Sequence, residues 1–263
     1  MEIITSEKNQ KIKELKKLYR SKWRRKTGRY VLEGVRLIRA ALKAGAVFDR
    51  VFVTPELAAE EDLPGRLQSR TGIDVIYVAQ QLIENISDTV SPQGITAIVA
   101  DPDYTREDIT ETGPVLVLDR IQDPGNMGTL IRTAAAAGYA GIICLKGCVD
   151  IYNLKVLRAT MGAIFQLPVV TGEELNSFLA QMLPDERRLI CCDLAGEKYY
   201  HQLSYTFPHM LVIGNEARGI CNSILEVADE IVKIPLYGEV ESLNAAVAGG
   251  IVIYESAVNY YSS

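Results

Sequence analysis

Apolar and polar positions change in short, regular runs along the chain, and these runs predict strands that alternate with helices. In the front part, RVFVTP, DVIYVA and GITAIVA have the apolar, β-branched character of strands. Helical spacing predicts a helix over YVLEGVRLIRAALKAG ending at Gly45, one over PELAAEEDLPGRLQSRTG broken at Pro64-Gly65, and a short one over QQLIENIS. We therefore expect a small α/β sandwich over residues 30–100, with no catalytic constellation of its own.

The polar stretch Asp101–Pro114 contains two prolines and a glycine, and we expect it to be a linker. Beyond it, Val115–Leu118 is a continuous apolar run of the kind buried in a parallel sheet. Further runs then alternate strand and helix up to EIVKIPL, which predicts a mostly parallel sheet covered on both faces. The expected domains are a basic leader over 1–29, the sandwich over 30–100, the linker over 101–114 and a larger α/β domain over 115–263.

The C-terminal stretch Ile234–Glu255 begins at the end of a strand, which Pro235 must stop. A loop with Gly238 follows, and then a helix whose N-terminal region carries Ser242 and Asn244. Small or apolar residues lie on all sides of this helix, so we expect it to be covered on two sides and to form a subunit interface. The alternative is a core helix with a serine cap. The expected core stripe is Leu243, Ala246, Val247, Gly250, Ile251 and Tyr254.

Residues 6–26 predict an amphipathic helix with a thin apolar stripe of Ile12, Leu15, Tyr19 and Trp23. The stripe can pack on the body of the protein while lysine and arginine face solvent. One interpretation is a solvated helix that only packs its stripe on the body. In the other, compatible with the first, these cations contact phosphates along an RNA backbone and Trp23 is a candidate for stacking on a base. The expected RNA contacts are Lys22, Arg24, Arg25, Lys26 and Arg29.

Charge is unevenly distributed over the 263 residues. The first 29 hold eleven Lys and Arg against three Glu, a net charge of +8, whereas the whole chain carries −5 and the remainder therefore −13. A basic arm on an acidic body indicates a polyanionic partner. The longest apolar runs are too short for a membrane span, and the charged N-terminus does not resemble a signal peptide.

The five cysteines lie in apolar contexts without a CxxC pair, which is typical of reduced thiols in a cytoplasmic protein. The two histidines, His201 and His209, are not in an HExxH spacing, so we expect no metal site.

Three expected strand ends carry glycine together with a few polar groups: Asp119–Asn126, Gly214–Gly219 and Ile234–Asn244. In parallel sheets, ligands bind beyond such carboxyl ends. No GxGxxG or GxxxxGK[ST] motif follows a strand, which argues against a dinucleotide fold and a P-loop. Asn126 is the expected N-cap of a helix ending at Gly138. Arg132 lies off the apolar stripe of that helix, so it can point into a cleft above the strand end, and the alternative is an ordinary surface arginine.

Three motifs in this order, LDRIQDPGNMGTLIRTAAAAG, LVIGNEARGI and IPLYGEVESLNAAVAGGIVIYE, resemble those of the SpoU (TrmH) family of RNA ribose methyltransferases in the SPOUT superfamily. The front part, from RYVLEGVRLIRAAL onward, resembles the L30-like substrate-binding domain of many members. The resemblance implies a deep trefoil knot and an S-adenosylmethionine site. It further implies a homodimer with the last helix in its interface.

The resemblance also implies the site residues. Gly214, Ile234, Leu243 and, more weakly, Leu194 correspond to the cofactor pocket. The catalytic set comprises Arg132, Asn126, Glu216, Ser242 and Asn244. The alternatives are a capping role for Glu216 and a helix-start role for Ser242 and Asn244. The family arginine has been proposed to take the proton of the ribose 2′-hydroxyl. A guanidinium with a pKa above about 12 rarely deprotonates, so we favour stabilisation of the developing alkoxide by Arg132.

The expected activity is methyl transfer from S-adenosylmethionine to a ribose 2′-hydroxyl of RNA, ribosomal RNA above all. Two alternatives remain open at this point. One is a transfer RNA methyltransferase on the same fold, and the other is an RNA-binding or ribosome-assembly protein without catalysis.

Overall fold

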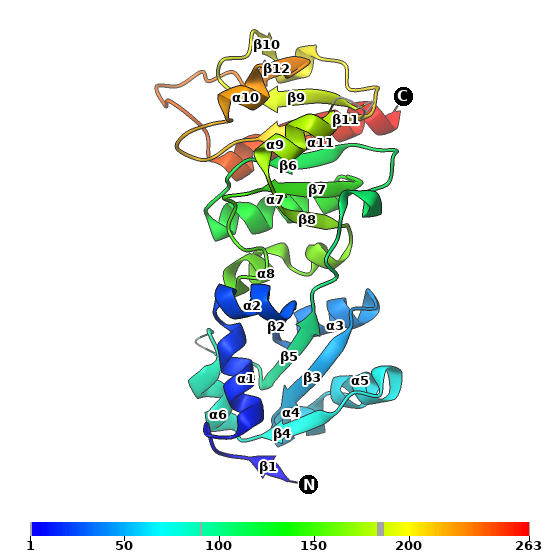
Figure 1. Ribbon diagram of the computed structural model, residues 1–263, viewed down its shortest axis with the longest axis vertical. Helices are drawn as coiled ribbons and strands as arrows, with labels where there is room; N and C mark the ends of the chain where they lie inside the picture. Colours follow the sequence, from blue (N-terminus) through cyan, green and yellow to red (C-terminus); the bar gives the residue numbers. More distant parts are fainter. Residues whose placement is uncertain (1, 90, 183–186, 263) are drawn as a thin grey trace. The chain divides into compact units, whose positions relative to one another are not determined.

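The computed structural model describes residues 2–89, 91–182 and 187–262 (Figure 1). The chain forms two compact units, Met1–Asp103 with Tyr152–Phe165, and Tyr104–Ile151 with Gln166–Ser263. This grouping differs from the expected domains in three respects. The leader over 1–29 belongs to the first unit, residues 104–114 of the expected linker belong to the second unit, and one internal segment changes unit. The segment Tyr152–Phe165, expected in the second domain, belongs to the first unit.

The first unit is built on a five-stranded mixed sheet, in which β1, β4 and β3 are parallel and β5 lies antiparallel to both β3 and β2. Its strands, in sheet order, are β1 (Ile3–Ile4), β4 (Val75–Val78), β3 (Phe48–Val53), β5 (Ile95–Ala100) and β2 (Arg29–Glu33). Its helices are α1 (Gln10–Leu18), α2 (Ser21–Thr27), α3 (Val35–Lys43), α4 (Pro55–Glu60), α5 (Leu63–Thr71), α6 (Gln80–Ile86), α8 (Leu154–Thr160) and the 3₁₀ turn η2 (Ala163–Phe165).

The leader is folded into the first unit, but not as the single helix expected over 6–26. It forms α1 and α2, separated at Arg20, whose extended backbone begins the second helix. The apolar residues Ile12 and Leu15 are fully buried, so this part of the stripe does pack on the body. The guanidinium of Arg24 donates to the carbonyl of Leu18 over 2.8 Å and so satisfies an acceptor where α1 ends.

Two further expectations for the first unit were wrong in detail. The helix expected over Tyr30–Gly45 begins only after Gly34, because the preceding residues form β2 and pair with β5. The run Tyr-Val-Leu favours a strand, and Gly34, with φ of 90°, turns the chain into α3. The second wrong detail is the helix break expected at Pro64-Gly65. The break falls at Glu61–Asp62 instead, because Pro64 lies in the first turn of α5, where the proline's missing N–H leaves no helical hydrogen bond unmade.

The second unit contains a seven-stranded sheet in which every neighbouring pair is parallel. In sheet order the strands are β10 (Lys198–Tyr199), β12 (Glu230–Lys233), β9 (Arg188–Cys192), β11 (His209–Ile213), β6 (Val115–Leu118), β7 (Gly141–Leu145) and β8 (Val169–Glu173). The helices are α7 (Pro124–Ala136), α9 (Leu175–Met182), α10 (Asn222–Leu225), α11 (Ala245–Ser262) and the 3₁₀ turns η1 (Arg106–Asp108) and η3 (Tyr200–Gln202).

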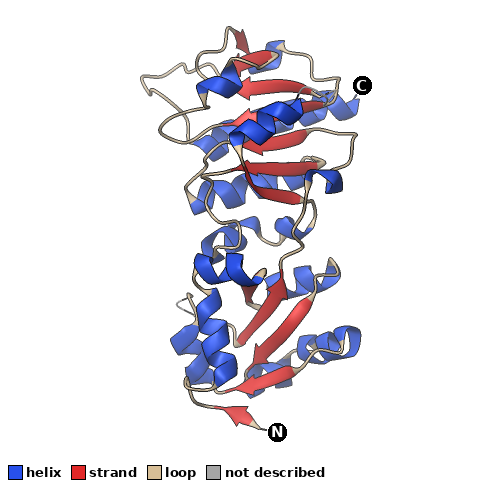
Figure 2. Ribbon diagram, in the orientation of Figure 1, coloured by secondary structure: helices blue, strands red, loops and turns tan. Residues whose placement is uncertain are grey.

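Helices cover both faces of this sheet, with α9 and α10 in front and α7 and α11 behind in Figure 2. Alternate strand residues therefore enter different cores. Val115 and Val117 of β6 join the core that contains Phe178 of α9. On the other face, Gly249 of α11 lies so close to Leu130 of α7 that an added Cβ would come within 2.4 Å of its side chain. The expected α/β fold with a mostly parallel sheet is confirmed, whereas the trefoil knot stays a prediction.

Within one chain, α11 is covered on one side only. Its buried residues are Ala246, Gly249, Val252, Ile253, Ser256 and Ala257. Val247 and Tyr254, which were expected in the core stripe, are about half exposed, and so are Val258 and Tyr261. An apolar stripe on this helix therefore faces away from its own chain. Among the described residues, no helix is long and apolar enough to cross a membrane, and no group of three potential metal ligands is found.

Candidate active site at the carboxyl ends of the parallel strands

The first of the three loops is shaped by the sequence Asp-Pro that precedes α7. Asp123 is the N-cap, and its side chain accepts a hydrogen bond of 2.8 Å from the backbone of Asn126. Pro124 occupies the first turn. The expectation that Asn126 caps this helix was wrong, because Asp123 already does so. The side chain of Asn126, 8% exposed, is therefore free to make other contacts.

Asn126 joins the three loops through its side-chain amide. Its Nδ2 donates to Oε1 of Glu216 in the second loop over 3.0 Å. Its Oδ1 accepts from Nδ2 of Asn244 in the third loop over 2.9 Å. Asn244 in turn caps α11, because its own Oδ1 accepts from the backbone of Ala246 and Val247. Three of the five expected catalytic residues thus form one hydrogen-bonded chain.

The carboxylate of Glu216 is held by several donors. Besides Asn126, the backbone amides of Asp123 and Gln122 donate to its two oxygens over 3.2 and 3.3 Å. Partial burial by itself would raise the pKa of Glu216. The hydrogen bonds from Asn126 and the backbone outweigh it, so the pKa lies below its ordinary value. Glu216 is therefore a fixed, ionised acceptor at neutral pH.

Two residues that the sequence pattern did not identify, Asp119 and Asn215, connect the first two loops by hydrogen bonds. Asp119, only 2% exposed, binds the guanidinium of Arg120 over 2.7 Å and accepts from the backbone of Cys221 over 2.8 Å. Asn215 donates from Nδ2 to the carbonyl of Arg120 over 2.7 Å. The available signal was an aspartate directly after the buried strand Val115–Leu118, since such a buried carboxylate needs partners.

Gly214 is required by a close approach within the protein. An added Cβ would lie 2.4 Å from the carbonyl carbon of Gly219 and 2.5 Å from the nitrogen of Ile220. Asn215 and Gly219 form a short antiparallel bridge, which brings these backbone segments together. The glycine therefore allows the second loop to close tightly after β11.

A hollow of about 450 Å³ opens between the second and third loops, and it includes the loop after β9. Six residues expected in the site line it: Leu194, Gly214, Glu216, Ile234, Ser242 and Leu243. Leu236, Ala245 and Ala248 add small or apolar surface, and Asp193 and Glu241 add carboxylates. The hollow has the size and mixed lining of a small-molecule site.

Arg132 is not brought into this hollow by its own chain. It lies on α7, is exposed, and makes no hydrogen bond or ion pair within the described ranges. Asn126 and Asn244 also do not line the hollow; Asn126 is hydrogen-bonded to Glu216, which does, and Asn244 lies between Leu243 and Ala245, which also do. The role expected of Arg132 stays a prediction.

The structure separates the five expected RNA contacts of the leader into two kinds. Lys22, Arg25 and Lys26 are exposed on α2. Arg24 is 8% exposed and bound to a backbone carbonyl, and Arg29 pairs with Asp49 over 2.8 Å. The first three are therefore accessible to a polyanion, whereas Arg24 has a structural task.

The sequence matches two known protein-family models, one over most of the second unit and one over most of the first. Residues 113–254 match the model of the SpoU rRNA Methylase family. The chain belongs to the SpoU rRNA methylase family. Residues 9–97 match a second model, the MRM3-like substrate binding domain. Both parts of the expected resemblance are thus confirmed.

Relatives and solved structures of the SpoU family match nearly the whole chain. The chain is 35% identical to the 23S rRNA (guanosine(2553)-2′-O)-methyltransferase RlmP of Bacillus subtilis, covering 97% of this chain and 98% of that one. It is 34% identical to the mitochondrial rRNA methyltransferase 3 of Mus musculus, covering 89% of this chain and 68% of that one. An AdoMet-bound rRNA methyltransferase from Sinorhizobium meliloti has the same fold, with a TM-score of 0.88, 30% identity and 97% of each chain covered.

Proposed function

We propose that the protein transfers a methyl group from S-adenosylmethionine to a ribose 2′-hydroxyl of ribosomal RNA. The observation that carries the proposal is the hydrogen-bonded chain of Asn126, Glu216 and Asn244 beside a ligand-sized hollow. These residues belong to a member of the SpoU rRNA methylase family that is 35% identical to a relative named as a 23S rRNA 2′-O-methyltransferase.

The hollow suits S-adenosylmethionine. Gly214, Ile234, Leu243 and Leu194 would hold the cofactor, with apolar side chains for the adenine and carboxylates for its cationic groups. When bound, the cofactor supplies a methyl group on a positively charged sulfonium. The protein has to align the ribose oxygen with that methyl, and alignment of this kind can lower a barrier by about 7–11 kcal/mol.

The 2′-hydroxyl must lose its proton as the new bond forms. In this proposal Arg132 stabilises the negative charge that develops on the oxygen, since a guanidinium stays protonated. Glu216, Asn126, Ser242 and Asn244 orient the ribose and the loops. Removal of an electrostatic donor of this type lowers turnover by about 10²–10³-fold.

We also propose that two copies associate through α11. Val247, Tyr254, Val258 and Tyr261 form its exposed apolar stripe, while Ala245 and Ala248 at the start of the same helix line the hollow. A second copy would cover the stripe. In the resulting two-fold dimer, the α7 of each copy would lie close to the subunit interface. Sedimentation of the wild type and of Val258→Glu tests this, because a buried charge should shift the dimer to a monomer.

Methyl transfer is tested by incubating the protein with methyl-labelled S-adenosylmethionine and ribosomal RNA lacking the modification. A 2′-O-methyl group protects the adjacent phosphodiester from alkali, so the label should appear in alkali-resistant dinucleotides. Transfer RNA and Arg132→Ala protein are run in parallel.

The outcomes separate the three functions. Label in ribosomal RNA that depends on Arg132 supports the proposal. Label in transfer RNA alone would identify transfer RNA, and not ribosomal RNA, as the substrate. Binding of ribosomal RNA without any incorporated label would indicate an RNA-binding protein without catalytic activity. Label in bases instead of riboses would overturn the proposed chemistry.

A further inference from the structure

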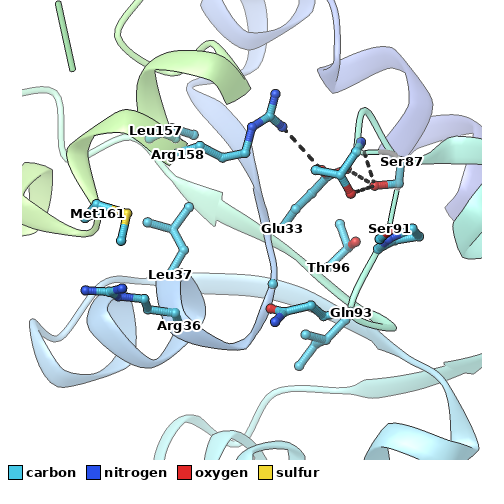
Figure 3. Close-up of a pocket in the computed structure, with 14 residues that line it drawn as sticks. Glu33, Arg36, Leu37, Ser87, Ser91, Gln93, Thr96, Leu157, Arg158 and Met161 are labelled. Carbon is cyan, nitrogen blue, oxygen red and sulfur yellow. Dashed lines mark hydrogen bonds and ion pairs between the residues drawn. The ribbon is translucent and has the colours of Figure 1, made fainter. Parts of the chain in front are cut away.

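The first unit contains a pocket of about 400 Å³ that is separate from the cofactor hollow (Figure 3). It is bounded by β2, the start of α3, the segment leading into β5, and α8. Apolar side chains of Leu37, Leu157 and Met161 lie beside the polar side chains of Glu33 and Arg158. A pocket that combines an apolar wall with a few polar groups is typical of a ligand site.

Glu33 is the most unusual group in this pocket, because its side chain is only 7% exposed. Three donors converge on Oε1: the hydroxyl of Tyr19 over 2.6 Å, the hydroxyl of Ser87 over 3.0 Å and the amide of Asp88 over 3.2 Å. Burial and the negative charge of Glu33 raise the pKa of Tyr19, so its hydroxyl remains a donor. Oε1 is thus saturated and the carboxylate is fixed in place.

The second oxygen of Glu33 is buried and accepts no hydrogen bond. Nη1 of Arg158 lies 3.8 Å from it and is likewise buried without a hydrogen-bond acceptor. The other end of the guanidinium is anchored, since Nη2 donates to Asp88 over 3.0 Å. The two atoms form an ion pair of 3.8 Å without a hydrogen bond, so an acceptor and a donor with unsatisfied hydrogen-bonding capacity lie side by side in the pocket. Buried polar groups of this kind normally have partners, which points to a ligand.

We infer that this pocket receives one unpaired nucleobase of the RNA, whose edge donates to Oε2 of Glu33 and accepts from Nη1 of Arg158. Every nucleobase carries a donor beside an acceptor on its pairing edge, and proteins read RNA mainly through such edges on unpaired bases. The inference rests on the proposed action on RNA, and it places a base contact in the unit that matches a substrate-binding domain model.

The surroundings favour a base that belongs to a polynucleotide. Arg36 is exposed at the rim of the pocket and can meet a neighbouring phosphate, while Leu37 and Met161 offer apolar surface to the face of a ring. Thr96, only 1% exposed, and Gln93 add polar groups to the lining. A free nucleotide would present the same edge, so the test includes mononucleotides.

The test measures binding of fluorescein-labelled RNA decamers to the full-length protein by fluorescence anisotropy. The probes are decamers of A, of C, of U and of alternating G and U, together with an abasic ribose-phosphate decamer. We expect at least one base-containing decamer to bind ten or more times more tightly than the abasic one. Nucleoside 5′-monophosphates should compete only at far higher concentration than RNA.

Glu33→Gln is the decisive variant. Its amide oxygen can take over the three donors of Oε1, which leaves an NH₂ group where the pocket offered an acceptor. We expect this variant to lose the base-dependent part of the affinity, about tenfold, although removal of a negative charge should strengthen RNA binding. Glu14→Gln is the control, because Glu14 pairs with Arg50 in the same unit and does not line the pocket. Thermal unfolding checks that both variants fold.

Arg158→Gln gives a second measurement, with Lys155→Gln on the same helix as its control. Both changes remove one positive charge, but only the first should abolish discrimination between base-containing and abasic probes. The inference is overturned if the abasic decamer binds as tightly as all others, if both glutamine variants keep the discrimination, or if mononucleotides bind better than RNA. Base-independent binding alongside methylation of ribosomal RNA would refute the pocket alone and leave the proposed function standing.

Discussion

Nδ2 of Asn244 donates to Oδ1 of Asn126 over 2.9 Å, although 118 positions separate the two residues along the chain. The orientation of the Asn126 side-chain amide follows from Glu216. Because the ionised carboxylate of Glu216 can only accept hydrogen bonds, Nδ2 of Asn126 must face Glu216, and Oδ1 of Asn126 then faces Asn244. One ionised group therefore fixes the order of donors and acceptors through all three loops.

Replacement of Asn126 by aspartate should be more harmful than its small change in size suggests. The substitution would place a second carboxylate against Glu216 and remove the donor that Glu216 requires. We expect a loss of about 1–3 kcal/mol of stability together with reduced methyl transfer. Denaturant unfolding and the methylation assay measure the two effects. Asn222→Asp, at an exposed helix start, is the control. Equal stability of the two variants would show that the hydrogen bonds between Asn126, Glu216 and Asn244 do not contribute to the stability of the fold.

Arg132→Ala should lower methyl transfer by about 10²–10³-fold and leave the affinity for S-adenosylmethionine within a few-fold. The reason is that Arg132 does not line the hollow yet is proposed to meet the ribose oxygen. Isothermal titration and single-turnover methylation separate binding from chemistry. Wild-type turnover in the alanine variant would remove Arg132 from the mechanism.

The position of Arg132 outside the hollow of its own chain suggests that the arginine acts across the proposed dimer. Arg132→Ala chains mixed with Leu243→Arg chains, each inactive alone, should then recover about a quarter of the wild-type rate, because half of the randomly paired dimers hold one complete site. Confirmed mixed dimers without recovery would assign the arginine to its own chain.

Gly214→Ala should destabilise the second unit by about 1–3 kcal/mol, since the added methyl meets the backbone of Gly219 and Ile220. Gly238→Ala is a matched control, as no atom lies within 4 Å of its added Cβ. Thermal unfolding compares the two variants. A Gly214→Ala protein that melts with the wild type would mean that this turn relaxes at little cost.

The lowered pKa of Glu216 predicts a specific pH dependence. A carboxyl group whose folded pKa lies below its unfolded value of about 4.3 stabilises the protein above that value and ceases to do so as pH falls through the folded pKa. The stability difference between the wild type and Glu216→Gln should thus be constant near neutrality and shrink below about pH 4.3. Urea unfolding across pH measures it, and a difference that grows on acidification would contradict the assignment.

The exposed cations of α2 should contribute to RNA affinity through phosphate contacts. We expect Lys22→Gln with Arg25→Gln to weaken binding of ribosomal RNA and to reduce the salt slope by up to about 2. Lys43→Gln with Lys155→Gln removes two exposed charges elsewhere and should change the slope less. Identical slopes would mean that the leader is a structural element only.

The order of strands and helices in the second unit could be predicted because each buried strand is a clear apolar run bounded by turn residues. The meeting of the three loops could also be predicted, since the carboxyl ends of parallel strands share one edge of the sheet. Periodicity could not show which partners each polar group takes. Asp119 and Asn215, for example, act through contacts to distant backbone atoms.

The wrong predictions for the front unit have specific physical causes. Tyr30–Glu33 pairs with a strand that lies far along the chain, and this pairing overrides a helical pattern in the sequence. Arg24 shows the limit of charge counting, because an arginine in a basic run can be buried and satisfy a carbonyl. The pocket around Glu33 was not predicted either, since it is formed by residues from separate stretches of the chain.

The assignment of Tyr152–Phe165 to the first unit means that the polypeptide passes between the two units three times, near residues 103, 151 and 165. No single cleavage can release the first unit intact. A fragment beginning at Tyr104 would carry α8 without its partners and leave the buried Leu154, Val156 and Leu157 in water. Simple truncation before Tyr104 would therefore deprive the first unit of α8 and leave α8 on the second unit without β2, its partner in the first unit.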